Sequence, residues 1–379
     1  MKDYGFFPEI HGNFGFGCMR LPMQDGKVDY AEFCRMADAF VEAGFNYFDT
    51  AHGYISGQSE TAIRDCVSGR YDRSRFLLTD KLTEPYFNRQ EDIRPFVLKQ
   101  LELCGVSYFD FYLMHAQDHN NYKKFQRCRA YETAQELKRE GLIRHVGISF
   151  HDKAEMLDRI LTDHPEIEIV QIQFNYVDYE DASVESRKVY EVCEKHGKPV
   201  IVMEPVKGGS LVKLPPEADS ILRDLGGGSN ASYAIRFAAS FPKMAMVLSG
   251  MSDLAQMRDN LSAMKDFQPL TAREMIAVQN VCAIFKGQNL IPCTSCRYCV
   301  DENQCPKGIR IPDVFAALNA HEAFHDWNTG FYYNSVLTGD GHGKASECIR
   351  CGKCERVCPQ HLPIRELLRK AAEAFEKDA

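Results

Sequence analysis

The sequence predicts an α/β fold, a (β/α)8 barrel of the TIM type followed by a small, mostly helical domain rich in cysteine. Three observations lead to this prediction. Short apolar, β-rich runs alternate eight times with longer amphipathic segments over the first three quarters of the chain, which is the pattern of parallel β/α units. No glycine-rich dinucleotide fingerprint follows the first run, and this disfavours a doubly wound sheet. Eight cysteines form two compact groups near the C-terminus.

Each element of the barrel has its own run in the sequence. Strands are expected at residues 15–21, 47–51, 76–81, 109–115, 146–150, 170–175, 200–204 and 246–249. Amphipathic helices are expected, among others, at residues 30–43, 93–104, 130–140, 184–195, 231–239 and 254–264. Strands that alternate with helices in this way close into a barrel. The best glycine cluster, residues 226–228, comes late and follows no strand, so we interpret it as a flexible link into a helix.

The domain boundary is predicted near Gly287. A helix expected at residues 274–285 carries the chain out of the barrel. Residues 1–286 are therefore assigned to the barrel and residues 287–379 to the cysteine domain. A chain of 379 residues is long enough for one large domain and one small one.

The composition excludes several classes of protein. Hydrophobic residues make up 45% and charged residues 26% of the chain, which is typical of a globular protein. The net charge of −8 argues against nucleic acid or an anionic membrane as a partner, and no apolar stretch is long enough to span a bilayer. No apolar run of signal-peptide type opens the chain. The cysteines outside the two groups fit a reducing compartment, so we expect a cytoplasmic protein.

The cysteine groups have a spacing typical of iron–sulfur proteins. The first group is Cys293-x2-Cys296-x2-Cys299-x5-Cys305-Pro306, and the second is Cys348-x2-Cys351-x2-Cys354-x3-Cys358-Pro359. The second group reproduces the bacterial ferredoxin run, in which three cysteines bind one [4Fe–4S] cluster and the fourth binds the other. Zinc sites usually show pairs of cysteines rather than triplets, disulfides need an oxidising compartment, and buried structural cysteines occur singly.

We therefore predict a ferredoxin-like iron–sulfur domain with two [4Fe–4S] clusters and crossed ligands. A tight loop presents three thiolates to three corners of a cubane, and the fourth corner needs a distant cysteine. One cluster is then bound by Cys293, Cys296, Cys299 and Cys358, and the other by Cys348, Cys351, Cys354 and Cys305. Each Cys-Pro precedes an apolar-periodic segment, so the two groups are interpreted as copies of one unit that opens into a short helix. This part of the chain resembles the helical ferredoxin-type domains that serve as electron modules in larger oxidoreductases.

Polar residues stand where the predicted strands of the barrel end. Asp49, Lys81 and His115 lie at the ends of the second, third and fourth strands, and Tyr54 follows the second strand by a few residues. Barrel enzymes carry their chemistry at this end of the strands, and a lone charge is costly to bury, so we expect one shared site. Lys81, paired with Asp49, would lower the pKa of Tyr54 from about 10. Tyr54 would then give a proton to a carbonyl oxygen that His115 orients.

Three segments around these residues resemble the aldo/keto reductases. They are Phe48-Asp49-Thr50-Ala51-His52-Gly53-Tyr54, Thr79-Asp80-Lys81-Leu82 and Tyr112-Leu113-Met114-His115. All four members of that family's Asp, Tyr, Lys, His tetrad are present, in order and in register with the strands. The resemblance covers residues 12–264 and implies a nicotinamide-dependent carbonyl reductase. Taken singly, each residue also has a structural interpretation: a helix cap, a loop aromatic, a surface charge and a core histidine.

The same resemblance implies the residues that bind the cofactor. Ser149 and Gln171 match positions that bind the nicotinamide carboxamide, and Met203 stands where the family normally has a tyrosine that stacks on the nicotinamide ring. Ser249 and Gly250 lie in a segment that normally carries lysine, Gln256 replaces the arginine that pairs with the 2′-phosphate, and Asn260 matches a residue that contacts adenine. A 2′-phosphate recruits Arg or Lys. This sequence lacks both the lysine and the arginine of the family, although Lys207 or Arg258 could replace them. The choice between NADH and NADPH as the cofactor therefore stays open.

Together the two domains predict an oxidoreductase in which the clusters relay electrons between the barrel site and a carrier such as ferredoxin. Nicotinamides carry two electrons as hydride, whereas [4Fe–4S] clusters pass electrons singly. A flavin commonly converts between the two, and the sequence shows no signature for one. Two alternatives stay open: the clusters are structural or redox-sensing while the barrel reduces a small carbonyl substrate with NAD(P)H alone, or the barrel is a non-catalytic subunit of an electron-transfer complex.

Overall fold

The computed structural model describes residues 6–288, 290–301, 304–324, 328–339 and 341–376, and these form two compact units. The first unit contains residues up to Val206 together with Asp219–Gln279, and the second contains Lys207–Ala218 together with the chain from Asn280 onward. The predicted boundary after residue 286 remains a prediction. Contacts instead separate the units within helix α11 (Ala272–Gly287) and assign the segment 207–218 to the second unit.

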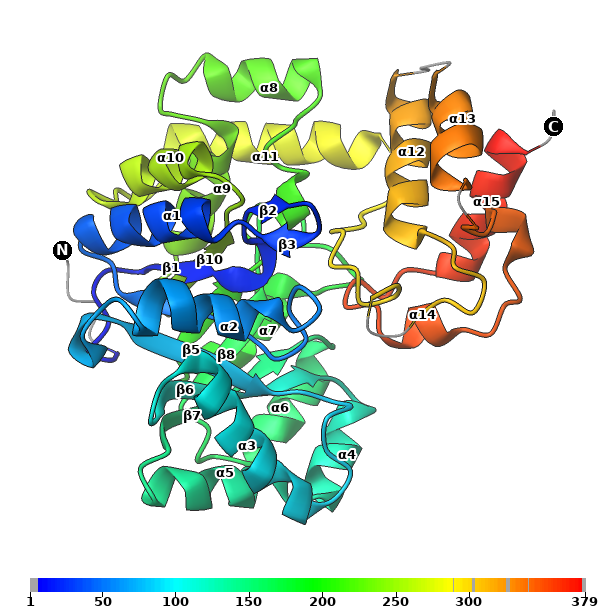
Figure 1. Ribbon diagram of the computed structural model, residues 1–379. Coiled ribbons are helices and arrows are strands. Elements are labelled where there is room, and N and C mark those ends of the chain that lie inside the picture. Colours follow the sequence, from blue (N-terminus) through cyan, green and yellow to red (C-terminus); the bar gives the residue numbers. More distant parts are fainter. Residues whose placement is uncertain (1–5, 289, 302–303, 325–327, 340, 377–379) are drawn as a thin grey trace. The chain divides into compact units, whose positions relative to one another are not determined.

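The first unit is a closed barrel of eight parallel strands, as predicted (Figure 1). The strands, in chain order, are β1 (Phe14–Gly17), β4 (Tyr47–Asp49), β5 (Leu77–Leu82), β6 (Phe109–Gln117), β7 (Ile143–Phe150), β8 (Ile169–Gln173), β9 (Val200–Met203) and β10 (Met244–Gly250). Each strand pairs with its neighbour in the chain, and β10 closes the ring against β1. The first strand ends at Gly17, earlier than expected, because Cys18–Arg20 turn into a 3-10 helix.

Helices connect the strands of the barrel. They are α1 (Tyr30–Glu42), α2 (Gln58–Ile63), α3 (Gln90–Cys104), α4 (Asn121–Arg127), α5 (Ala130–Arg139), α6 (Ala154–Asp163), α7 (Ser186–Lys195), α8 (Pro216–Arg223), α9 (Asn230–Ala239) and α10 (Leu254–Met264). The helices expected from periodicity are all present, and the sequence analysis did not single out α2, α4, α6 or α8. A short antiparallel hairpin, β2 (Met23–Gln24) with β3 (Lys27–Val28), follows the first strand.

One layer of buried side chains fills the interior of the barrel, and several of them come from the first residues of the strands. Nine buried residues make this layer: Tyr47, Leu77, Phe111, Leu113, Ile169, Ile201, Ala245, Met246 and Leu248. Gly147 is required within it, because a Cβ there would lie 2.6 Å from the carbonyl oxygen of Ile169. Since Tyr47, Leu77 and Ile169 are the first residues of their strands, the opposite ends of the same strands are left to carry polar side chains.

The second unit is mostly helical. Its helices are α12 (Ile311–Phe324), α13 (Asn328–Tyr332), α14 (Lys353–Arg356) and α15 (Ile364–Phe375), with a π-helix at Tyr333–Leu337. They pack around an apolar core of their own, in which the rings of Tyr333 and Phe375 stack with their centres 4.7 Å apart. As expected, each Cys-Pro is followed by a helix, α12 in one case and α15 in the other.

The backbone confirms that the two cysteine groups are copies of one unit. Left-handed residues occur two and four residues after the first cysteine of each group and three residues after its last. They are Ser295, Arg297 and Gly308 in the first group and Arg350, Gly352 and His361 in the second. Non-glycine residues rarely adopt this conformation. Four of these six residues are not glycine, so the match indicates the same loop built twice. Among the described residues, no helix has the length and apolar character needed to cross a bilayer.

Candidate active site and cysteine cavities

Three ionisable side chains meet where neighbouring strands of the barrel end. Asp49 is the last residue of β4, Lys81 the penultimate residue of β5, and His115 lies near the end of β6. Lys81 Nζ donates to Asp49 Oδ1 and to the carbonyl oxygen of Thr50, both at 2.7 Å. The Lys81 side chain is completely buried. The lysine is therefore fixed by an ion pair that water does not reach.

Tyr54 completes the group. It is 8% exposed, and its ring lies with its centre 4.9 Å from Lys81 Nζ and 6.1 Å from the centre of the His115 ring. Its backbone N–H donates to Ala51, and two residues in the left-handed conformation, Ile55 and Ser56, turn the chain directly after it. The structure thus brings together all four residues that the sequence analysis assigned to one site.

Burial sets the charge states of this site. It raises the pKa of Asp49, while the Lys81 ammonium and the Gln171 amide lower it, so the carboxylate has a cation to balance its charge. Burial, followed by the nearby Lys81 charge, holds the pKa of His115 well below its usual value, which makes the imidazole neutral. Thr83 Oγ1 lies 2.8 Å from His115 Nδ1. The same hydroxyl also lies 3.3 Å from the carbonyl oxygen of Lys81, and we assign its single proton to the shorter contact, with Nδ1. The ring proton of the neutral imidazole is then on Nε2, ready to donate.

Replacing Lys81 with methionine should lower the free energy of unfolding of the barrel by about 3–5 kcal/mol at pH 7, because it leaves Asp49 ionised in a dry site. Loss of the ammonium raises the pKa of Asp49 further, so the destabilisation should fade as the pH falls through that raised value. Urea unfolding followed by circular dichroism at several pH values measures this. Asp49→Asn combined with Lys81→Met should regain most of the loss, and equal stability of the single and double variants would contradict the ion pair.

Two polar residues continue the site around the barrel. Ser149 on β7 and Gln171 on β8 are register partners. Gln171 Nε2 donates to Asp49 Oδ2 at 3.3 Å, which ties this pair to the tetrad. Ser149 Oγ is buried and has no hydrogen-bond partner among the described residues. Met203, the last residue of β9, is half-buried. A buried hydroxyl without a partner fits a ligand group that donates and accepts hydrogen bonds, as a carboxamide does.

The other predicted cofactor residues lie around the end of β10. Asn260 Nδ2, on α10, donates to Ser249 Oγ at 2.8 Å, and both side chains are buried. Gln256 is engaged locally, since it accepts from the N–H of Ser252 and donates to Asp253. Arg258 lies on α10, whereas Lys207 belongs to the second unit.

Arg20 is a residue that the sequence analysis missed. Its side chain covers Gly250 so closely that a Cβ at position 250 would lie 3.2 Å from Arg20 Cδ. The available signal was its position, three residues after β1, the strand that pairs with β10. The barrel unit therefore places a cation beside the end of β10, although not at position 256.

The eight clustered cysteines line two cavities in the second unit. One cavity, of about 340 Å³, is lined by Cys305, Cys348, Cys351 and Cys354. The other, of about 330 Å³, is lined by Cys293, Cys296, Cys299 and Cys358. These are the two predicted sets of four, each with three thiols from one group and one from the other. Ile311, the first residue of α12, lines both cavities, so the two cavities are neighbours.

The lining of each cavity suits an anionic cluster held by thiolates. The larger cavity carries Lys307, Lys353 and Arg365 in its wall, and the other carries Arg297. Four thiolate ligands give a [4Fe–4S] centre a net negative charge, which neighbouring cations offset. Four sulfur donors with cationic side chains beside them therefore fit this cofactor.

Comparison with known proteins agrees with both halves of the chain. Residues 13–282 match the family model described as "Aldo/keto reductase family", and residues 292–363 match that of the "4Fe-4S dicluster domain". The uncharacterized oxidoreductase YqkF of Bacillus subtilis is 24% identical over 300 residues, which cover 70% of this chain and 91% of that protein.

Solved structures show the same barrel. Aldo-keto reductase AKR11C1 from Bacillus halodurans, in its holo form, is 25% identical and superimposes with a TM-score of 0.57 over 72% of this chain and 92% of that chain. An aldo-keto reductase from Klebsiella pneumoniae in complex with NADPH is 18% identical, with a TM-score of 0.57 over 71% of this chain and 90% of that chain. The barrel, its group of Asp49, Tyr54, Lys81 and His115, and the family match agree: the chain belongs to the aldo/keto reductase family and carries a 4Fe-4S dicluster domain after its barrel.

Proposed function

We propose that the barrel reduces a small-molecule carbonyl compound with NADH or NADPH, or oxidises the corresponding alcohol, with Tyr54 as the proton donor. The observation that supports this most directly is the position of Lys81, bonded to Asp49 and 4.9 Å from the centre of the Tyr54 ring. A cation held there stabilises the phenolate that remains when Tyr54 gives up its proton. Membership of an oxidoreductase family supports the same chemistry.

Each residue of the site has a separate task in this reaction. When bound, a nicotinamide dinucleotide supplies the hydride for the substrate carbon. Tyr54 gives its phenolic proton to the substrate oxygen, and His115 Nε2–H orients that oxygen by a hydrogen bond. Lys81 holds the charge that develops on Tyr54, and Asp49 holds Lys81 in place. The balance is one carbonyl, one NAD(P)H and one proton for one alcohol and one NAD(P)⁺.

The residues proposed to contact the cofactor lie on β7, β8, β9, β10 and α10. Ser149 and Gln171 would hold the carboxamide, and Met203 would cover the nicotinamide ring. Ser249, Gly250, Gln256 and Asn260 would line the nucleotide half, with Arg20 as the nearby cation. The Klebsiella relative, which was solved in complex with NADPH, supports a nicotinamide dinucleotide as the cofactor.

Gln256→Arg should improve NADPH binding relative to NADH by about tenfold, because a charge-assisted hydrogen bond to the 2′-phosphate contributes about 1.5–3 kcal/mol. Asp253, which now accepts from Gln256, competes for the new guanidinium and keeps the gain at the lower end. Fluorescence titration with each nucleotide measures the ratio. Gln256→Ala is the control, since it removes the amide without adding charge. An unchanged ratio in Gln256→Arg would place the 2′-phosphate elsewhere.

For the second unit, we propose that the two sets of four cysteines bind [4Fe–4S] clusters that relay electrons between the barrel site and a carrier such as ferredoxin. Bound clusters transfer electrons singly, so two transfers match one hydride. Ile311 lines both cavities, and this closeness supports exchange between the clusters.

One anaerobic preparation tests the whole proposal. We expect about eight irons per chain and oxidation of NADH or NADPH that depends on an added carbonyl compound. Nucleotide oxidation without any dependence on a panel of aldehydes, ketones and dicarbonyls would contradict a reductase.

A further inference from the structure

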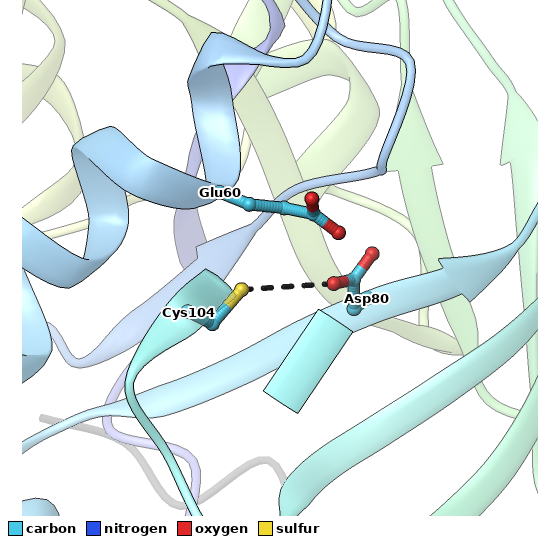
Figure 2. A group of neighbouring side chains, drawn as sticks. All are labelled: Glu60, Asp80 and Cys104. Carbon is cyan, nitrogen blue, oxygen red and sulfur yellow. Dashed lines mark hydrogen bonds between the residues drawn. The ribbon is translucent and has the colours of Figure 1, made fainter. Parts of the chain in front are cut away.

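The barrel contains a second group of ionisable side chains, adjacent to the tetrad in the chain, that the proposed reaction does not use. Figure 2 shows Glu60 from α2, Asp80 from β5 and Cys104 from α3, with the Glu60 carboxyl group directed at the other two. All three residues are 0% exposed. One oxygen or sulfur atom of each lies within 4.8 Å of the other two. Asp80 directly precedes Lys81, and Glu60 follows Tyr54 by six residues.

Half of the carboxyl oxygens in this group have ordinary donors. Asp80 Oδ1 accepts from the backbone N–H of Lys81 at 2.7 Å and from Gln100 Nε2 at 2.9 Å. Tyr112 fixes the Gln100 amide by donating to its oxygen at 2.6 Å. Glu60 Oε2 lies 2.7 Å from His52 Nδ1, which serves as its donor.

The two remaining oxygens, Glu60 Oε1 and Asp80 Oδ2, have no cation as a partner among the described residues. Glu60 Oε1 has no hydrogen-bond partner among the described residues. Asp80 Oδ2 has only the Cys104 thiol, at 3.7 Å. In the part of the chain that the structure describes, no lysine or arginine donates to either carboxyl group. Two ionised carboxylates in such a dry place repel each other strongly, and the usual solution is one proton shared between them.

The charged surroundings agree with this arrangement. Burial raises the pKa of Glu60 to about 7, and the neighbouring Asp80 and Gln100 side chains, followed by the Lys99 charge, lower it only partly. Burial, and next the Glu60 charge, raise the pKa of Asp80 well above its usual value, against a smaller effect of Lys81. The other titratable groups that face the pair are His52, Cys104 and Tyr112, and burial keeps each of them in its neutral form.

We propose that Glu60 and Asp80 form a proton-sharing pair, with one carboxylic acid proton between Glu60 Oε1 and Asp80 Oδ2, and that this pair positions Tyr54 and Lys81. Glu60 acts through His52, which lies in the loop between Asp49 and Tyr54, and Asp80 acts through the backbone of Lys81. The positioning role rests on the proposed function of the tetrad. The sharing of the proton does not.

Loss of the shared proton has a defined consequence. Negative charge left on the pair by loss of the proton has no cation in this dry site, and this drives Glu60 away and releases His52, so the Tyr54 loop loses its support. The stability of the folded chain is expected to change with pH in the same direction. A carboxyl group whose pKa rises from about 4.3 in the unfolded chain to about 7 in the folded one supports the fold below the lower value. That support is lost as the pH rises through the higher value.

Glu60→Gln is the decisive variant, because glutamine mimics the protonated acid. Its amide nitrogen can donate permanently to Asp80 Oδ2, and its oxygen can accept from His52. We expect the melting temperature of this variant to stay level from pH 6 to pH 8.5, whereas that of the unmodified chain falls. The alkaline limb of the kcat profile that ionisation of Glu60 causes should be lost in this variant, because glutamine has no acid proton to lose.

Asp110→Asn is the matched control, since Asp110 is equally buried but accepts from Arg73 and Arg144. Because the Asp110 carboxylate pairs with two arginines, Asp110→Asn should lower the stability at pH 7, and the loss should be the same at pH 8.5. Amide hydrogen exchange of the loop 50–57 gives a positional readout without turnover. In the unmodified chain the protection of this loop should fall above pH 7.5, and in Glu60→Gln it should not.

Three results would overturn the proposal. Superimposable stability profiles of Glu60→Gln and the unmodified chain would exclude the shared proton. Equal loop exchange in the two proteins would exclude the positioning role. One zinc ion per chain by mass spectrometry, lost in Glu60→Gln together with stability, would make the group a metal site. Absence of reductase activity from the unmodified chain would refute the proposed function alone, because the melting and exchange experiments would still decide the pair.

Discussion

Replacing Tyr54 with phenylalanine should lower kcat for carbonyl reduction by about 10²- to 10⁴-fold, the range that a positioned general acid contributes. The change removes one oxygen atom from a side chain that is almost completely buried. The ring keeps its place beside Lys81 and His115, so the pocket keeps its shape. The deficit should therefore appear in kcat, while the dissociation constant of the nucleotide stays the same.

Stopped-flow measurement of nucleotide oxidation separates these quantities, with fluorescence titration for binding. Tyr86→Phe is the control: this tyrosine is 40% exposed, and its ring stacks on Phe96 outside the tetrad. It should behave as the unmodified chain does. Full activity in Tyr54→Phe would show that another group protonates the substrate oxygen, and His115, whose Nε2–H faces the site in our assignment, would be the first to test.

The tetrad was predictable from sequence because two simple rules act together. The alternation of apolar runs predicts where the strands end, and the C-terminal ends of parallel strands lie on the same side of a barrel. Asp49, Lys81 and His115 are ionisable residues at the ends of three consecutive strands, so their convergence needs no knowledge of packing. The cysteine sets were predictable for a similar reason, since a short loop limits which thiols can meet.

Other features depend on contacts that leave little trace in the sequence. Glu60 looks like an ordinary helix residue until α2 packs against α3 and brings it near Asp80 and Cys104. The assignment of residues 207–218 to the second unit depends on a close approach of two backbones, for which Gly208 is the only local sign. A Cβ there would lie 2.3 Å from the carbonyl oxygen of Thr294. The hydrophobic periodicity of the sequence cannot predict such a contact, because the contact joins segments far apart in the chain.

Replacing Cys351 with serine should abolish electron transfer from an external one-electron donor while leaving NAD(P)H-driven reduction in place. Cys351 is an exposed residue in the wall of the larger cavity, so serine there does not disturb the core of the second unit. A serine hydroxyl is a much weaker ligand than a thiolate for this cluster. The iron content should therefore fall from about eight to about four per chain, with loss of one of two paramagnetic signals in the reduced protein.

Cys282→Ser is the control, since Cys282 lies outside both cavities on α11 and is half-buried. It should keep its iron and both activities. The two assays use the same carbonyl substrate under anaerobic conditions, one with reduced ferredoxin and one with NADH or NADPH. If both activities persist in Cys351→Ser although iron is lost, the cluster relays nothing and its role is structural or redox-sensing. If only the ferredoxin-driven activity disappears, the barrel and the clusters exchange electrons, because the barrel site itself has lost no ligand.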